Sequence, residues 1–227
     1  MKKIQVILNA PKDIILLFAF AIFCTNGFAY TAELPIAISA QDGQAELTNR
    51  VSYFVDTKRN LLLTDILEVT DWKSSKDNSL NFGYNTDPHW LKFSVIGAPG
   101  TIQLKQLLVI NYPVLDSIDI YFKSDSGEFE VVHAGDCYPF SSRKYPYRHF
   151  VIPFNVSDQS PTQFYIRVQT RSSAQIPLSL WNETAFAQYI NRENYALGIY
   201  YGIFLVMYCA KAVSFHNERG ICAEDLV

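Results

Sequence analysis

Two long apolar runs flank a central region in which short apolar and polar stretches alternate. The runs cover residues 14–23 and 195–213. Between them, turn residues separate strand-like segments, and no helical pattern of similar length intervenes. The segments are 51–55, 90–95, 104–110, 117–122, 129–133, 147–154, 163–170 and 175–181. This spacing predicts a mostly β fold, an antiparallel jelly roll or β-sandwich of roughly eight strands over residues 50–182.

The first apolar run has the features of a secretory signal. Lys2, Lys3 and Lys12 precede it, and the small-residue ending Gly27-Phe28-Ala29 follows it. A basic region, an apolar core and such an ending predict a signal peptide over residues 1–29, cleaved after Ala29. An uncleaved anchor helix is the alternative. Either way, the β-rich part is expected outside the cytoplasm.

The second apolar run is long enough to cross a membrane. A helix over 195–213 would be roughly 28 Å long, close to the ~30 Å thickness of the bilayer core. Lys211 interrupts the run near its end and Arg219 follows it, and this bias predicts an inner-membrane helix with its C-terminal end in the cytoplasm. The expected layout is therefore an irregular segment (30–49), the sandwich, a helical connector (183–194), the membrane helix and a short tail (214–227).

Composition narrows the function classes. The net charge of −3 provides no basic patch, so nucleic acid is an unexpected partner. Of the four cysteines, only Cys137 falls in the exported domain, so no internal disulfide is expected there. The four histidines are scattered without metal-ligand spacing, and a glycine-rich phosphate loop is missing from the sequence. We therefore expect no enzyme activity, metal or cofactor.

One segment, residues 135–149, combines tyrosines with cationic side chains. Such a mixture offers flat apolar faces and forked N–H donors, which suit sugars and small carboxylates. The candidate ligand-binding residues are Asp136, Arg143, Tyr145, Tyr147 and Arg148. Trp72, in a polar stretch, is a further stacking candidate, whereas Trp90 begins an alternating strand and is expected in the core. The alternative is a loop whose tyrosines pack on the sandwich and whose arginines pair with carboxylates such as Asp136 or Asp116.

Several motifs resemble a known family in the same order. They are Leu80-Asn81-Phe82-Gly83-Tyr84 with Trp90-Leu91-Lys92-Phe93, the stretch Tyr112 to Tyr121, Gly135-Asp136 with Pro139 to Arg143, Tyr165-Ile166-Arg167-Val168, and Leu197 to Gly202. Over residues 50–207 the chain resembles the second type of extracellular domain of bacterial seven-transmembrane receptors with diverse intracellular signalling modules (7TMR-DISM). The last motif resembles the start of the first membrane helix of those receptors.

The resemblance implies a periplasmic jelly roll with a likeness to carbohydrate-binding modules, which passes a signal through seven helices. This chain departs from that plan after Met207, where a polar tail replaces further apolar residues. A truncated or frameshifted gene and a genuine single-pass protein both explain the departure. The expected function is sensing of a small, carbohydrate-like ligand. The alternative is a membrane-tethered domain that binds an envelope protein, or a second copy of itself, and no small molecule.

Overall fold

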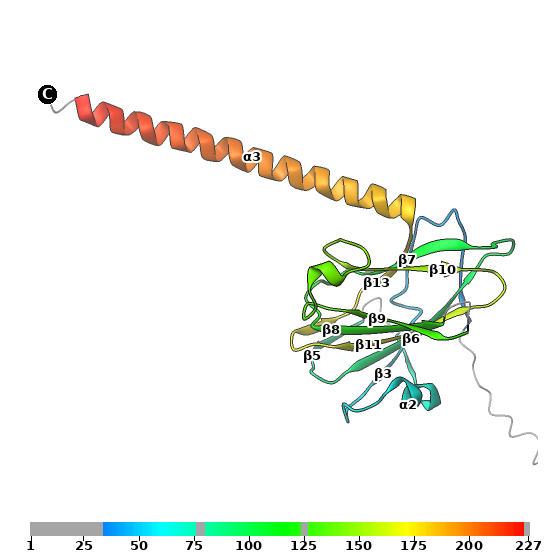
Figure 1. The fold of residues 1–227 in the computed structure, drawn as a ribbon. Coiled ribbons are helices and arrows are strands. Elements are labelled where there is room, and N and C mark those ends of the chain that lie inside the picture. Colours follow the sequence, from blue (N-terminus) through cyan, green and yellow to red (C-terminus); the bar gives the residue numbers. More distant parts are fainter. Residues whose placement is uncertain (1–33, 76–79, 124–126, 225–227) are drawn as a thin grey trace, which may run out of the picture. The chain divides into compact units, whose positions relative to one another are not determined.

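The structure, a computed structural model, describes residues 34–75, 80–123 and 127–224. The predicted signal peptide and the last three residues of the predicted tail lie outside these ranges. Within them, the chain forms three β-sheets, and one long helix follows the last strand (Figure 1). The predicted mostly β fold with a C-terminal apolar helix is confirmed.

The larger sheet has seven strands, in the order β4-β3-β6-β11-β8-β9, with β1 pairing in parallel with β6. All its other pairings are antiparallel. The strands are β1 (Ile36–Ile38), β3 (Ser52–Val55), β4 (Lys73–Ser74), β6 (His89–Gly97), β8 (Ser117–Lys123), β9 (Phe129–Ala134) and β11 (Thr162–Gln169). β8 and β9 form the hairpin that the sequence predicts, with Gly127 at a φ of 83° between them.

The smaller main sheet has four strands in the order β10-β7-β13-β2, all antiparallel. They are β2 (Gln44–Glu46), β7 (Leu104–Ile110), β10 (Phe150–Val156) and β13 (Leu178–Asn182). Pro153 lies within β10, which is an edge strand and therefore tolerates a residue without an N–H donor. β5 (Asn81–Tyr84) and β12 (Ser173–Gln175) make a separate two-stranded sheet.

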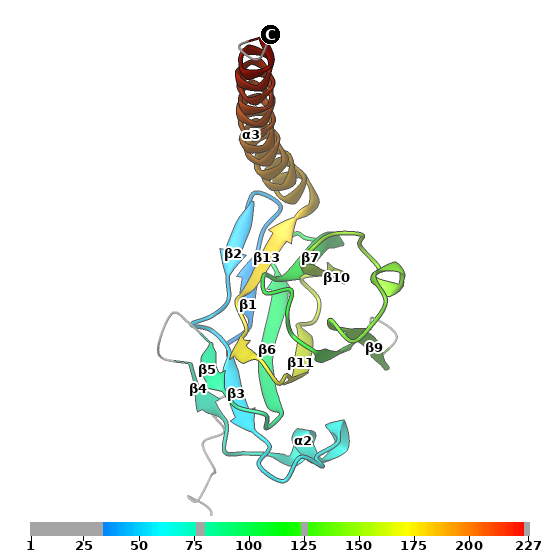
Figure 2. The same cartoon turned by 90° about the vertical axis from the view of Figure 1, so that its left-hand side faces the viewer.

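The core lies between the two main sheets, which form separate layers in Figures 1 and 2. Side chains alternate along each strand, so that Leu91, Phe93 and Val95 of β6 are all buried in it. Their neighbours Phe164 and Ile166 on β11 point to the same side and are fully buried. Period-two patterning thus gives one continuous apolar layer.

The outer face of the larger sheet carries a second apolar cluster, covered by the short helix α2 (Leu63–Glu68). Asp65 accepts a hydrogen bond from the Leu62 N–H at 2.9 Å, which satisfies a free donor at the start of this helix. Ile66 then packs with Trp90 and Tyr165, and all three are buried. Trp90 is therefore a core residue, as expected, although on the outer face of the sheet.

The structure differs from the predicted elements in the number and bounds of the short strands. The segment 30–49, predicted to be irregular, contains β1 and β2, which are only three residues long and carry too little pattern to be recognised. The predicted strand 175–181 is divided into β12 and β13, because Pro177 cannot donate to a ladder. From β3 to β13 the described chain has eleven strands rather than roughly eight, the additional ones being short.

A single helix, α3 (Glu183–Glu224), replaces the predicted connector, membrane helix and start of the tail, without a break between them. The Asn182 side chain accepts a hydrogen bond from the Ala185 N–H at 2.7 Å and so caps the first turn. Phe186 is fully buried against Leu107, Val109 and Val151 of the smaller sheet. The first turns of α3 are thus part of the domain core.

Candidate functional site

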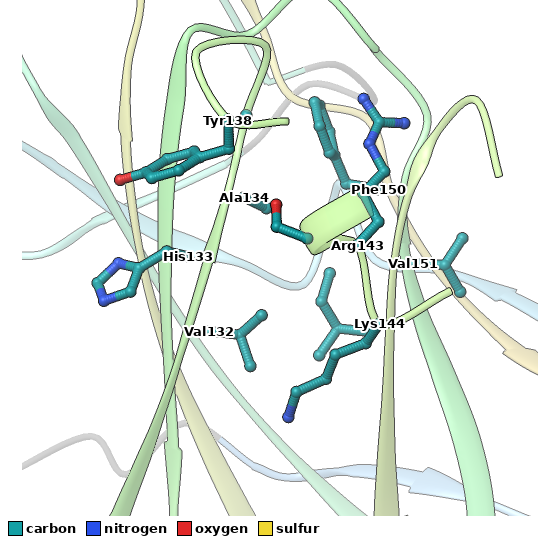
Figure 3. Close-up of a pocket in the computed structure, with 11 residues that line it drawn as sticks. Val132, His133, Ala134, Tyr138, Arg143, Lys144, Phe150 and Val151 are labelled. Carbon is teal, nitrogen blue, oxygen red and sulfur yellow. The ribbon is translucent and has the colours of Figure 1, made fainter. Parts of the chain in front are cut away.

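A pocket lies at one edge of the sandwich, between the end strands β9 and β10 of the two main sheets. The segment 135–149, here called the edge loop, connects these strands and closes the pocket. The lining residues are Val132, His133, Ala134, Gly135, Tyr138, Ser142, Arg143, Lys144, Phe150, Val151 and Ile152. Figure 3 shows His133 and Tyr138 on one side, Arg143 and Phe150 on the other, and the Lys144 amine below them.

The pocket is nearly filled by its own side chains. Its cavity volume is ≈ 20 Å³, which is room for about one water molecule. A sugar ring therefore enters only if the edge loop moves outward. Any binding function of this pocket depends on the contacts that hold the loop in place.

The start of the edge loop is held by backbone hydrogen bonds to the segment before β8. The Asp136 N–H donates to the Leu115 carbonyl at 2.7 Å, and the Cys137 N–H donates to the Asp116 carbonyl at 3.1 Å. A short 3₁₀ helix, η1 (Phe140–Ser142), follows. The Asp136 side chain is exposed and is absent from the pocket lining.

Arg143 organises the second half of the loop. Its Nη1 donates to the carbonyls of Tyr147 at 2.6 Å and Arg148 at 2.9 Å. The guanidinium lies over the rings of Phe140 and Phe150, with centroids 4.9 and 4.7 Å away. Its Nε is buried and has no hydrogen-bond partner in the described part of the chain. Arg143 thus ties the second half of the loop together through backbone carbonyls and keeps one buried donor without a partner.

The rim of the pocket on the β9 side carries an aromatic pair. The His133 and Tyr138 rings stack with centroids 6.3 Å apart. His133 Nδ1 contacts the Asp119 carboxylate at 2.7 Å, and Asp119 also faces Arg167 at 3.5 Å. The rim therefore combines an aromatic face with a hydrogen-bonding ring.

The remaining tyrosines of the edge loop point to α3 instead of the pocket. Tyr145 and Tyr147 make edge-to-face contacts with Phe186, at 5.7 and 5.4 Å. The Tyr147 hydroxyl and the Arg148 guanidinium both donate to the Glu193 carboxylate of α3. Desolvation and the bond to Glu193 raise the pKa of the Tyr147 hydroxyl. Bonding to Glu193 likewise raises the pKa of the Arg148 guanidinium.

Trp72 lies apart from the edge loop, in the cluster on the outer face of the larger sheet. Its indole N–H donates to the Val69 carbonyl at 2.9 Å, and the Lys92 ammonium lies 5.4 Å from its ring centroid. The structure therefore brings Arg143 to the pocket, brings Tyr145, Tyr147 and Arg148 to α3, and places Trp72 with neither.

Sequence reasoning did not single out His133, Lys144 or Glu193 as site residues. Lys144 and Tyr138 lie in the same tyrosine-rich and cationic segment as the candidates, so the composition of that segment could have identified them. No sequence pattern identifies His133 or Glu193, because their partners Asp119 and Tyr147 lie 14 and 46 residues away in the chain.

The chemistry available at the pocket is binding by cations and aromatic rings. Among residues 34–75, 80–123 and 127–224, no group of three or more His, Cys, Asp or Glu side chains could hold a metal ion. Arg143 and Lys144 offer positive charge, while Tyr138 and Phe150 offer apolar faces. This combination suits a ligand that has both a ring and an acceptor group.

The helix that follows the domain is suited to a membrane. Over Glu183–Phe215 it is long and apolar enough to cross a bilayer, judged by length and composition. Large apolar side chains such as Ile203, Phe204 and Leu205 are more than half exposed along it. Exposed apolar surface of that extent on a helix is typical of contact with lipid.

Among the comparisons with known proteins, the match to one family model is informative. A search of curated proteins finds no match. One matching solved structure is a family GH115 4-O-methyl-alpha-glucuronidase with specificity for decorated arabinogalactans, 12% identical, with a TM-score of 0.24. The match covers 57% of this chain and only 16% of that enzyme, and similarity at this level carries no argument. The model of the 7TMR-DISM extracellular 2 domain, in contrast, matches residues 48–182, which include every strand of the sandwich from β3 to β13. The chain belongs to the 7TMR-DISM extracellular 2 family.

Proposed function

We propose that this chain is the periplasmic sensor part of a membrane signalling receptor, and that it binds a small carbohydrate-like ligand at the pocket between β9 and β10. The observation that supports this most is the unpartnered, buried Nε of Arg143, a residue that lines the pocket together with Lys144 and the Tyr138 ring. A buried donor without a partner is costly, and an acceptor on a ligand would satisfy it. Membership of a receptor sensor family, rather than an enzyme family, supports the same function.

The direct test is calorimetric titration of the full chain in lipid nanodiscs with a matched pair of sugars, galactose and galacturonic acid. We expect the carboxylated sugar to bind more tightly, because it can accept from Arg143 and Lys144. Arg143→Ala and Tyr138→Ala should each weaken that binding about tenfold or more. Lys58→Ala, at an exposed position in the turn after β3, is the matched control and should bind like the wild type. Equal binding by Arg143→Ala would remove the pocket from consideration.

The alternative function is a membrane-tethered domain that binds an envelope protein and no small molecule. The observation that favours it is the small volume of the pocket. Under that alternative, neither sugar binds, and covalent cross-linking from the exposed Tyr138 captures a protein at the rim. Retained cross-linking with no sugar binding would favour the interaction domain.

Orientation in the membrane is part of the proposal. Lys211 and Arg219 follow the apolar stretch of α3, so we place the C-terminal end in the cytoplasm and the sandwich in the periplasm. Alkaline phosphatase, which is active only after export, should be inactive when fused after Val227. Activity of that fusion would reverse the orientation.

A further inference from the structure

The carboxylate of Glu193 accepts hydrogen bonds from three side chains near the start of α3, in the first turns here called the base of α3 (residues 183–193). Tyr147 and Arg148 of the edge loop donate to Oε2, and Tyr189, one turn earlier on the same helix, donates to Oε1 at 2.7 Å. We propose that Glu193 is the coupling residue between the pocket and the membrane helix: a ligand that displaces the edge loop releases Glu193, and thereby frees the first turns of α3. This rests on the proposed function, because it assumes that a ligand occupies the pocket.

The pocket cannot be filled without disturbing this contact. Its ≈ 20 Å³ cavity leaves a sugar ring no space unless the edge loop moves. One of the loop residues at the pocket, Arg143, donates to the backbone carbonyls of Tyr147 and Arg148, whose side chains bind Glu193. An acceptor that draws the Arg143 guanidinium toward the pocket therefore pulls on the two residues that hold α3.

The base of α3 also depends on the loop for its packing. Phe186 is fully buried, and the rings of Tyr145 and Tyr147 contact it edge to face. Withdrawal of the loop thus removes charge-assisted hydrogen bonds and aromatic contacts from the same two turns of helix. The sandwich would retain the exposed ion pair of Lys105 with Glu183 at 2.7 Å and the Asn182 cap on the first turn of α3.

This arrangement identifies a matched pair of carboxylates. Glu183 and Glu193 both lie on α3 and both form an ion pair with a residue outside the helix, but Glu183 pairs with Lys105 of β7 and Glu193 with Arg148 of the edge loop. A structural role common to both would give similar effects when either is removed. A coupling role would affect the edge loop only when Glu193 is removed.

The first experiment mimics a ligand without requiring one. Ala134→Phe places a ring in the pocket, and Val131→Phe places the same ring on an exposed position of the same strand. Hydrogen exchange is measured on the full chain in nanodiscs. We expect Ala134→Phe to raise exchange about tenfold at residues 143–149 and also at 184–193, with β6 and β11 unchanged. Val131→Phe should change neither segment. A rise at 143–149 alone would overturn the proposal.

The second experiment reads the coupling in the opposite direction, because coupling between two sites is reciprocal. Glu193→Ala should raise exchange at 143–149 about tenfold, whereas Glu183→Ala should leave that segment as in the wild type. If Ala134→Phe fails to fold, this pair decides the question. An edge loop unaffected by Glu193→Ala would overturn the proposal. Both experiments omit ligand, so failure of the sugars to bind tests the proposed function separately.

Discussion

Phe93 on β6 and Phe164 on β11 are paired on adjacent strands of the larger sheet. Their rings stack, with centroids 4.9 Å apart and 8° between their planes. Phe164 also meets Phe154 of the smaller sheet edge to face at 4.8 Å. One ring thus joins the two layers of the sandwich at the middle of the core. Phe93 and Phe164 are both fully buried.

Phe164→Ala should lower the free energy of unfolding by about 3–5 kcal/mol, because it removes a buried ring and leaves a cavity between the sheets. Urea unfolding of the full chain in detergent, followed by tryptophan fluorescence, measures this. Tyr84→Ala is the control, since Tyr84 is 89% exposed and its loss should cost no more than about 0.5 kcal/mol. Equal midpoints for the two variants would contradict the placement of Phe164.

Arg143→Ala should lower the free energy of unfolding by about 1–3 kcal/mol, because the carbonyls of Tyr147 and Arg148 lose a charged donor. The sequence left two roles open for Arg143, a solvent-facing ligand contact or a partner of a buried carboxylate. The structure gives a third arrangement, with backbone carbonyls as acceptors. Arg143→Lys should restore little, because an ammonium lacks the planar fork that lies between Phe140 and Phe150. Full recovery of the thermal midpoint by the lysine variant would show that charge alone suffices.

The strand pattern was readable from the sequence because each long strand buries one face. Leu104–Ile110 and Ser117–Lys123 agree with their predicted ranges within one residue. The start of β10 did not agree: the run was predicted from Tyr147, but the strand begins at Phe150. Tyr147 and Arg148 have strand-like neighbours, yet their side chains bind Glu193, 46 and 45 residues away. Local pattern contains no information on such a partner.

The candidate site was readable only as a segment. Alternating tyrosines and cations located the edge loop, but the division of its side chains between the pocket and α3 follows from the tertiary fold. Tyr145 and Tyr147 have the composition of a ligand-stacking pair and pack on Phe186 instead. Trp72 looked exposed because its neighbours are polar, yet it is half-buried beside Phe54 and Tyr165.

Stability should fall as the pH drops below about 6.5. His89 is 1% exposed, with its Nε2 unpartnered among the described residues and its ring stacked on Phe82 at 4.2 Å. Desolvation lowers its pKa from the ordinary value of 6.5, an effect that Asp87 only partly offsets. Just below pH 6.5, His89 is therefore protonated in the unfolded chain but neutral in the folded chain. The contribution of His89 is complete above pH 6.5 and is lost as the pH falls through its lowered pKa.

Thermal melting between pH 5 and 8 checks this. His89→Gln should have a shallower loss of melting temperature at the acid end than the wild type. Desolvation and the nearby Arg148 lower the pKa of His149 in the same direction, so His89→Gln with His149→Gln should be shallower still. A wild-type melting temperature that rises on acidification would reverse the sign of the argument.

Gly135 begins the edge loop in a conformation that other residues rarely adopt, with a φ of 133°. A Cβ atom there would lie 2.2 Å from the Asp116 carbonyl oxygen, in the segment that holds the next two residues by backbone hydrogen bonds. Gly135→Ala should therefore cost more than about 3 kcal/mol, since backbone strain and a clash with backbone add together. Gly127→Ala is the matched control, because Gly127 also has a positive φ, but none of the described residues has an atom within 4 Å of the added Cβ. It should cost only the strain, about 1–2 kcal/mol. Urea unfolding of both variants measures the difference in the free energy of unfolding. Equal losses for the two variants would mean that the edge loop does not need the close approach of Gly135 to Asp116.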